Sequence, residues 1–384
     1  MNILFYDMGS YIYRDLLYYL QQAGCSCDVI TYHFTDKFND TFFSKKFIEK
    51  IKDKQYDAVF SVNFFPIISQ ICYNLHTKYI SWCYDSPLEE RFMDYFEYDT
   101  NYIFLFDRIE VNFYRNAGYS HIYHLPLAVN TKRISSLKFS STQIASWTSD
   151  VSFVGHLYTS PLDILLNNVD TFTKGYIEGI MQAQLRIYGY YFIDELITDD
   201  LLNNLNMTYK QVDPNCTILN RRGLSFAIAT QITHIERSFL LEHLGALYNT
   251  YFYSTEKTMF SSPVKCMGPL KYYTQMPGVF RHSKLNLCPT LKSIQSGIPL
   301  RALDILGSQG VLLSNYQPEL ADNFTDGTDV IMYDSMDDAF EKIEYYLHNN
   351  TKRLQIAKNG YEKVCQNFSY PDRLKYIFEI AGLN

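Results

Sequence analysis

The sequence predicts an α/β protein with two domains, each built around a parallel β-sheet. Short apolar runs alternate with amphipathic helical patterns over the first 125 residues, and this alternation breaks off between residues 125 and 150. Apolar strands then resume after Asp150. Strands that alternate with helices are typical of parallel sheets covered on both faces. The 384 residues are enough for about two domains of ordinary size.

The first half is expected to hold six strands. Ile12, Leu16 and Leu20 recur at helical spacing after the first strand, and we expect Ser10 to cap that helix. The expected strands are residues 2–6, 27–31, 58–62, 78–84, 102–106 and 121–125, and further helices are expected at 42–52, 66–75, 88–96 and 109–116. Ligands bind beyond the carboxyl ends of such strands. This rule directs attention to Asp7, Asn63, Asp85 and Asp107.

The second half is expected to begin after a linker rich in Ser and Thr. Its predicted strands are residues 151–154, 251–253, 264–266, 285–288, 311–313 and 330–332, followed by helices at 336–347, 352–365 and 372–380. Residues 161–249 are mostly helical in pattern and too long for one crossover, so they predict a helical insert. The predicted domains are 1–130, a linker at 131–149, 150–370 with the insert, and a C-terminal helix at 371–384.

The stretch 282–315 carries the most specific pattern. An apolar strand leads into a loop of small polar residues, a helix follows at Pro299, and Gly310 is expected to close that helix. The small residues of the loop are Thr290, Ser293, Ser296 and Gly297. Backbone N–H groups and hydroxyls at a helix N-terminus suit a phosphate. Arg301 and Asp304 follow one turn apart, a spacing that equally fits a plain ion pair on a solvated face.

Composition and missing motifs exclude several classes of function. A net charge of −7 with no long Lys/Arg run argues against a nucleic-acid partner. The eight cysteines form no metal-binding or paired pattern, which indicates a reduced, cytoplasmic protein. The N-terminus lacks the features of a signal peptide, and no apolar run is long enough for a transmembrane segment. The sequence contains no D-x-D, G-x-G-x-x-G, P-loop or H-E-x-x-H motif.

A family resemblance rests on the same stretch. Its pattern, a Ser/Asn-containing strand followed by S-G-I-P-x-R-x-x-D, resembles the donor-site segment of GT-B glycosyltransferases, in the branch that includes spore-maturation CgeB-type proteins. The residues that match are Ser283, Asn286, Ser296, Gly297, Pro299, Arg301 and Asp304. A looser resemblance covers residues 78–130. The resemblance implies two Rossmann-like domains facing a cleft, with the C-terminal helix crossing back to the first domain.

The resemblance also implies roles for residues of the second domain. Gly297 and the hydroxyls around it would take the donor phosphates, Arg301 the leaving charge, and Asp304 the ribose, where many members carry Glu. Gly155 and His156 would approach the phosphates, although His156 fits an ordinary loop histidine equally well. Lys271 and Tyr272 would meet a phosphate and the nucleotide base, but a structural turn explains them as readily.

Asp85 is the candidate general base, since it follows a strand of the first domain at the expected ligand edge. A carboxylate there would deprotonate an acceptor hydroxyl for direct displacement at the sugar carbon. Asp85 would alternatively cap a helix that begins at Pro87. Asp7 and Asp107 occupy analogous strand ends and are the fallback candidates.

The function implied by the resemblance is metal-independent sugar transfer without a cofactor. The donor would be a nucleotide sugar, UDP-linked, such as UDP-N-acetylglucosamine. The acceptor would be a hydroxyl of a glycan or of a surface protein such as flagellin. Two other classes stay open: a nucleotide-sugar epimerase of the same fold, and an inactive nucleotide-sugar-binding protein.

Overall fold

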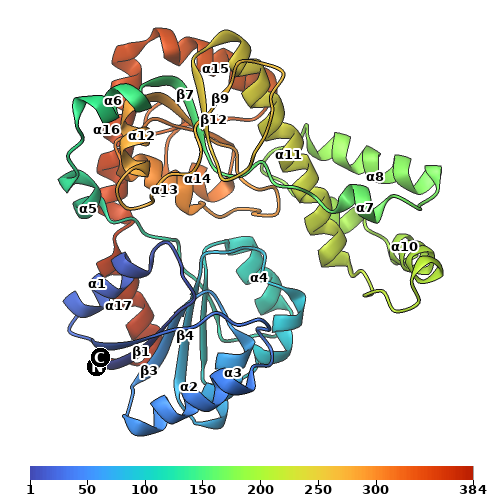
Figure 1. Ribbon diagram of the computed structural model, residues 1–384, viewed down its shortest axis with the longest axis vertical. Coiled ribbons are helices and arrows are strands. Elements are labelled where there is room, and N and C mark those ends of the chain that lie inside the picture. The colour runs from blue at the N-terminus through green and yellow to red at the C-terminus, as the bar shows by residue number, and fades with distance from the viewer. Residues whose placement is uncertain (384) are drawn as a thin grey trace. The chain divides into compact units, whose positions relative to one another are not determined.

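The computed structural model describes residues 1–383 and divides into two compact units. Unit 1 comprises Met1–Arg133, Gly297–Leu303 and Val364–Asn384, and unit 2 comprises Ile134–Ser296 and Asp304–Lys363. Each unit contains a six-stranded parallel sheet with helices on both faces (Figure 1). The predicted α/β fold class is confirmed.

The sheet of unit 1 has the strand order β2-β1-β3-β4-β5-β6. Its strands are β1 (Asn2–Asp7), β2 (Ser26–Thr31), β3 (Ala58–Val62), β4 (Lys78–Cys83), β5 (Asn101–Leu105) and β6 (Ile122–His124). The helices are α1 (Tyr13–Gln22), α2 (Thr41–Asp53), α3 (Pro66–Asn74), the 3₁₀ helix η1 (Glu90–Tyr95), α4 (Arg108–Asn116) and α17 (Tyr370–Ala381), while α5 (Thr131–Ser136) has residues in both units. All strand pairs are parallel, so their carboxyl ends share one edge.

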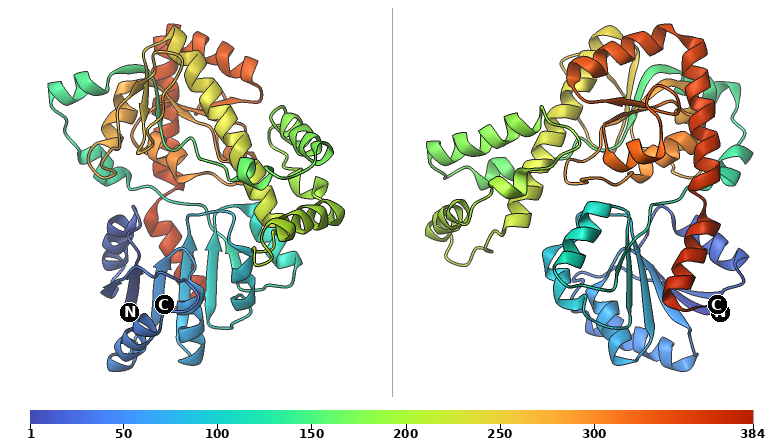
Figure 2. Two further views of the ribbon diagram at one scale, coloured as in Figure 1. Left: turned by 45° about the vertical axis from the view of Figure 1, so that its right-hand side comes forward. Right: turned by 180° about the vertical axis from the view of Figure 1, so that it is seen from behind.

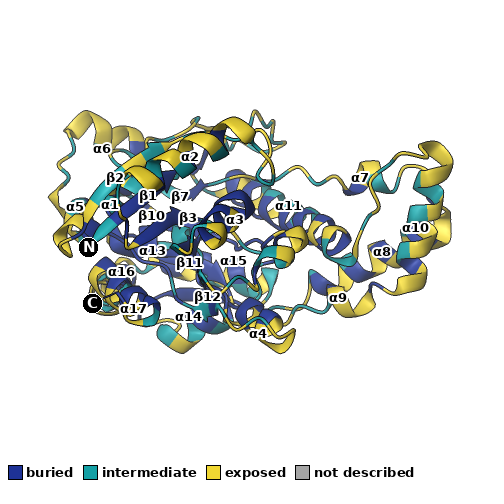
Figure 3. Cartoon of the chain, turned by 90° about the horizontal axis from the view of Figure 1, so that it is seen from below, coloured by how far each residue is buried: buried dark blue, intermediate teal, exposed yellow. Residues whose placement is uncertain are grey.

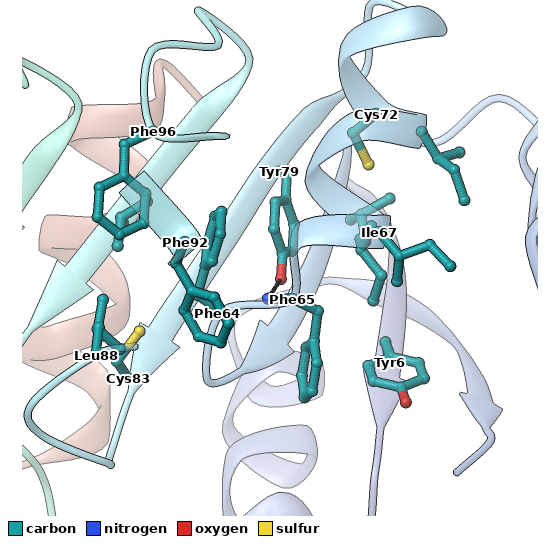
Figure 4. Packing of buried hydrophobic residues seen from close by; sticks show 14 of the residues in the cluster. Tyr6, Phe64, Phe65, Ile67, Cys72, Tyr79, Cys83, Leu88, Phe92 and Phe96 are labelled. Atoms are coloured by element: carbon teal, nitrogen blue, oxygen red, sulfur yellow. Dashed lines mark hydrogen bonds between the residues drawn. The ribbon is translucent and has the colours of Figure 1, made fainter. Parts of the chain in front are cut away.

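Aromatic residues fill the core on one face of this sheet. Figure 4 shows Phe64, Phe92 and Phe96 packed beside Tyr79, whose hydroxyl accepts a hydrogen bond of 3.0 Å from the Phe65 amide. The buried phenol therefore has its polar atom satisfied while its ring adds to the core. This accounts for part of the chain's high aromatic content.

The last helix, α17, packs on unit 1, as the fold prediction expected. Tyr370 at its start stacks on Tyr19 of α1 with ring centroids 5.1 Å apart. Arg373 donates to the Pro126 carbonyl oxygen at 2.9 Å. Ser369 caps the helix by accepting from the Asp372 amide. Apolar stacking and backbone contacts thus hold the C-terminal helix against the first sheet.

The sheet of unit 2 has the order β12-β11-β10-β7-β8-β9. Its strands are β7 (Ser149–Val154), β8 (Thr250–Tyr253), β9 (Lys265–Cys266), β10 (Ser283–Cys288), β11 (Leu312–Asn315) and β12 (Ile331–Tyr333). The associated helices are α6 (Ser141–Trp147), α12 (Met276–His282), α14 (Pro318–Asn323) and α15 (Met336–His348), while α13 (Leu300–Gly307) and α16 (Asn350–Asn367) each have residues in both units. Figure 3 shows the central strands of both sheets as buried, whereas the edge strands β2 and β9 contain exposed residues.

The predicted helical insert forms a separate small core within unit 2. It consists of α7 (Leu162–Leu165), α8 (Thr171–Gln184), α9 (Ile193–Leu196), α10 (Asp199–Val212) and the long helix α11 (Arg221–Leu247). Figure 2 shows α7 to α10 projecting from the sheet of unit 2, with α11 joining the two parts. Leu224, Ile228 and Ile232 of α11 belong to the insert core, whereas Leu240 and Leu244 belong to the sheet core.

The predicted linker at 131–149 contains two short helices that were not predicted, and α6 carries a capping box between Ser140 and Gln143 that its Ser/Thr-rich composition obscured. Three local predictions were wrong. Ser10 does not cap α1, whose N-cap is Ile12 without a side-chain hydrogen bond. The helix predicted at 88–96 is a short 3₁₀ helix. Helix α13 ends through Gln309, which adopts a φ of 61°, rather than through Gly310.

Gly310 follows the left-handed residue Gln309 at the end of α13, and its position also requires close packing. A Cβ atom at this position would lie 2.7 Å from the Phe280 carbonyl oxygen and 2.9 Å from Asn286 Nδ2. The Gly310 amide itself donates to the Ile305 carbonyl oxygen at 2.9 Å. Only glycine therefore lets the chain enter β11 at this distance from β10.

Candidate functional site

The strand order of unit 2 reverses direction between β7 and β10. From β7 the chain adds β8 and β9 on one side, and then adds β10, β11 and β12 on the other. The loops that leave β7 and β10 therefore diverge to opposite sides of the sheet. Such switch points are where open α/β sheets bind ligands beyond the strand ends. The loop at Gly155–His156 and the loop at 289–299 meet this condition.

The 289–299 loop is held in place by hydrogen bonds from several neighbours. The Thr290 amide donates to Asn315 Oδ1 at 2.6 Å, and the Lys292 amide donates to Thr233 Oγ1 at 3.0 Å. Ser296 Oγ donates to Glu319 Oε1 at 2.7 Å, while the Glu319 amide donates back to the Ser296 carbonyl oxygen. The loop is thus a built structure that leads into α13.

Two hydroxyls of this loop are buried without a hydrogen-bond partner among residues 1–383. They are Thr290 Oγ1 and Ser293 Oγ, on side chains that are almost fully buried. A buried polar group left unsatisfied costs about 1–3 kcal/mol. Such groups call for a ligand or water, which fits the predicted role of both residues in donor binding.

The structure brings Tyr272 and Asp304 together. The Tyr272 hydroxyl donates to Asp304 Oδ1 at 2.9 Å, and both side chains are buried. The sequence analysis assigned Tyr272 to the base and Asp304 to the ribose, which are neighbouring parts of one nucleoside. The contact orients the Asp304 carboxylate.

The other predicted donor residues occupy different settings. His156 is exposed, with its Nδ1 atom 3.6 Å from Glu256 Oε1, and the Gly155 amide donates to the Tyr253 carbonyl oxygen. Lys271 is exposed on the loop before α12, and Arg301 is half-buried in the first turn of α13. These four positions border loops or helix ends, and their ligand roles stay predictions.

Asn286 and Gly297 have structural roles in the protein interior. Asn286 is fully buried: its Nδ2 donates to the Phe280 and Val311 carbonyl oxygens, and its Oδ1 accepts from Ser152. Its amide therefore joins β10 to its neighbours. A Cβ atom at Gly297 would lie 2.6 Å from the Phe106 ring, both residues belonging to unit 1. The glycine is required by packing.

In unit 1 the analogous edge holds a carboxylate that an asparagine orients. Asn63 follows β3 with a φ of 68°, a conformation that asparagine tolerates. Its Nδ2 donates to Asp85 Oδ2 at 2.6 Å, while its Oδ1 accepts from the Tyr84 and Asp85 amides. No helix cap uses Asp85, since the following 3₁₀ helix has Glu89 as its N-cap. The capping alternative is therefore wrong.

The pKa of Asp85 is raised above its ordinary value. The main cause is desolvation by the surrounding protein, which Lys37 and the hydrogen bond from Asn63 partly offset. The Asp85 side chain nevertheless reaches solvent. A solvent-accessible carboxylate with a raised pKa suits proton abstraction.

Asp7 and Asp107 serve local structure. Asp7 Oδ1 accepts from the Gly9 and Ser10 amides at 2.9 and 3.1 Å. Asp107 caps α4 by accepting from the Ile109 and Glu110 amides. Both are buried, so Asp85 is the most accessible of the three candidate carboxylates.

Sequence reasoning missed three charged residues beside the 289–299 loop. Glu236 and Arg237 lie on α11, and Lys292 lies in the loop itself. Lys292 Nζ lies 2.8 Å from Glu236 Oε2, and Arg237 donates to the carbonyl oxygens of His156 and Pro289. The sequence contains no signal for their burial, because α11 carries further charged residues and charged side chains in a helix are usually solvated.

Among residues 1–383, no group of three or more His, Cys, Asp or Glu is arranged to hold a metal ion. In the same described range, no helix is both long and apolar enough to cross a membrane.

Comparison with known proteins identifies both the fold and the C-terminal region. Residues 236–379, less than half of the chain, match a family of glycosyl transferase-like proteins. No curated protein sequence matches the chain. The structure resembles sucrose-phosphate synthase from Thermosynechococcus elongatus, with a TM-score of 0.56 and 11% identity over 99% of this chain and 98% of that one.

Two further solved structures show the same fold. Anabaena HepE in complex with UDP-glucose gives a TM-score of 0.55 at 10% identity, covering 100% of this chain and 99% of that one. A glycosyltransferase from Rickettsia africae gives 0.54 at 10% identity, covering 99% and 97%. The chain therefore has the GT-B glycosyltransferase fold, with a glycosyl transferase-like region at residues 236–379.

Proposed function

We propose that this protein transfers a sugar from a UDP-linked donor, such as UDP-N-acetylglucosamine, to a hydroxyl of a glycan or surface protein such as flagellin, without a metal ion. Residues of the predicted domain 150–370 bind the nucleotide, and Asp85 supplies the base. The eight cysteines are free thiols, which supports a reducing, cytoplasmic setting.

The observation that carries this proposal is the switch-point edge of unit 2. The 289–299 loop lies at that edge, contains two buried hydroxyls that have no hydrogen-bond partner in the described part of the chain, and falls within the glycosyl transferase-like region. Solved complexes of Anabaena HepE, which has the same fold, contain UDP and UDP-glucose. The fold, the 289–299 loop and the solved complexes of Anabaena HepE together favour a UDP-linked sugar as the donor.

The chemistry follows from the groups at the two edges. Asp85 takes the proton of the acceptor hydroxyl, and the freed oxygen attacks the anomeric carbon of the sugar. The bond from that carbon to the phosphate oxygen breaks, and UDP leaves with the bonding pair. Helix α13 and Arg301 stabilise the charge that develops on the diphosphate. Asp304, oriented by Tyr272, holds the ribose.

The test measures release of UDP from a panel of UDP-sugars in EDTA, with and without acceptor glycans and hydroxyl-containing peptides. The proposal expects UDP release that rises with acceptor and persists in EDTA. Conversion to a different UDP-sugar without UDP release would identify an epimerase. Tight UDP binding without any turnover would identify a binding protein, and either result would contradict transfer.

A further inference from the structure

Helix α11 passes from the core of the insert to the core of the unit 2 sheet. Between these apolar segments it carries two adjacent charged residues, Glu236 and Arg237, of which 1% and 8% of the surface is exposed. Burying a charge is costly unless it is paired or hydrogen-bonded. The partners of these two residues therefore show what the helix contributes at this point.

Arg237 joins the two loops at the switch point. Its Nε donates to the Pro289 carbonyl oxygen at 3.0 Å and its Nη2 donates to the same atom, while its Nη1 donates to the His156 carbonyl oxygen. The guanidinium also lies 4.9 Å from the ring centroid of Tyr158 and 5.2 Å from that of Phe153. A planar fork of donors is suited to holding two backbone segments in one geometry.

Glu236 contacts the 289–299 loop through the side chain of Lys292. Its Oε2 lies 2.8 Å from Lys292 Nζ, and its Oε1 accepts from the hydroxyls of Tyr188 and Tyr333 at 3.1 and 2.9 Å. Burial, followed by the charge of Glu236, raises the pKa of both phenols, so they stay protonated donors. Tyr188 follows insert helix α8, and Tyr333 ends β12.

We propose that Glu236 and Arg237 are positioning residues of the donor site, which fix the loops after β7 and β10 in the arrangement that accepts a nucleoside diphosphate. Through Tyr188 the same network ties that arrangement to the base of the helical insert. Neither residue touches the ligand in this account, because Arg237 donates to the two loops and Glu236 contacts Lys292, Tyr188 and Tyr333. The inference rests on the proposed donor site of unit 2.

Glu236 and Arg237 should affect nucleotide binding because they preorganise the two loops. A buried ion pair adds little net stability, yet it selects one arrangement of its neighbours. Loops fixed before the ligand arrives lose less conformational freedom on binding, which improves affinity. Loosening the loops should therefore weaken nucleotide binding in addition to any loss of stability, whereas a buried charged residue away from these loops should affect stability alone.

The test compares Arg237→Met with Arg353→Met. Arg353 is the matched control, since it is equally buried in unit 2 and donates to the carbonyl oxygens of Tyr346 and Leu347. UDP affinity is measured calorimetrically at a temperature where circular dichroism shows every variant folded, and thermal unfolding is recorded separately. Glu236→Gln, which preserves the shape and the acceptor for both phenols, is the milder companion. Its control is Asp329→Asn, since Asp329 is a buried carboxylate of unit 2 paired with Lys363 Nζ at 2.7 Å.

The expected result is a loss of UDP affinity of about tenfold or more in Arg237→Met, with a smaller loss in Glu236→Gln and partial recovery in Arg237→Lys. Both control variants should lose thermal stability yet bind UDP as the wild type does. Unchanged UDP affinity in folded Arg237→Met, or in folded Glu236→Gln if the former does not fold, would overturn the inference. Absence of UDP binding by the wild type would instead contradict the proposed function.

Discussion

The two units contain sheets of the same size and strand direction, but their carboxyl-end edges differ in chemistry. At the edge of unit 2, backbone loops are fastened by buried charges, and two hydroxyls are left without partners among the described residues. At the edge of unit 1, a single amide orients one accessible carboxylate whose pKa is raised. The first arrangement suits binding of a charged ligand, and the second suits proton transfer.

The largest effect expected from this contrast is on turnover in Asp85→Asn. Loss of a general base lowers turnover by about 10²- to 10⁴-fold, while UDP affinity should stay unchanged. Initial rates and calorimetric UDP binding measure the two quantities separately. Asp107→Asn is the control, because asparagine can still cap α4. A comparable loss of turnover in the control would remove the distinction between the carboxylates.

A smaller effect is expected from Asn63→Gly. Glycine accepts the positive φ at this position but removes the amide that orients Asp85. Turnover should fall by about tenfold, consistent with losing roughly 1.4 kcal/mol of orientation. In the wild type the hydrogen bond from Asn63 lowers the pKa of Asp85. Its loss should raise this pKa, so the acidic limb of the pH–rate profile should also move to higher pH. An unmoved limb would show that Asn63 does not act through Asp85.

At the unit 2 edge, Tyr272→Phe should have a modest effect. The substitution removes the hydroxyl that donates to Asp304, and the stability should fall by about 1–3 kcal/mol. If Asp304 holds the ribose, UDP should also bind more weakly, while inorganic diphosphate should bind as before. Urea denaturation and competition binding measure these outcomes. Equal weakening for both ligands would place the residue outside the ribose site.

The smallest effect concerns stability against pH. The folded-state pKa of Asp85 is raised, so its contribution to stability is fully present below the unfolded-state pKa and is lost as the pH rises through the folded-state pKa. Asp85→Asn should therefore unfold at a slightly higher temperature than the wild type at neutral pH. The difference should vanish in acid, and a difference that grew in acid would contradict the raised pKa.

Much of the fold was predictable because both sheets follow simple periodic patterns. Apolar strands, alternating helices and the apolar residues of α13 identify their elements without knowledge of distant contacts. The linker helices were missed because Ser and Thr hid the capping box at Ser140 and Gln143. The 3₁₀ helix at Glu90–Tyr95 was mistaken for an α-helix, since its spacing is similar.

The candidate site was predictable where its residues follow strands, as Thr290, Ser293 and Asp85 do, or where they match the family resemblance, as Asp304 does. Arg237 was not predictable, because its partner Pro289 lies 52 residues away and the helix between two cores gives no sign of which charges are buried. Adjacent Glu and Arg in a helix are usually solvated, so only the three-dimensional structure reveals their contacts.

The most direct test of the contrast between the two edges is hydrogen–deuterium exchange with and without UDP, in EDTA. We predict that exchange slows in peptides covering residues 155–158 and 289–301. Peptides covering residues 7–12 and 84–88 of unit 1 should exchange at unchanged rates. Protection confined to the unit 1 peptides, or no protection anywhere at saturating UDP, would contradict the assignment of nucleotide binding to the switch-point edge of unit 2.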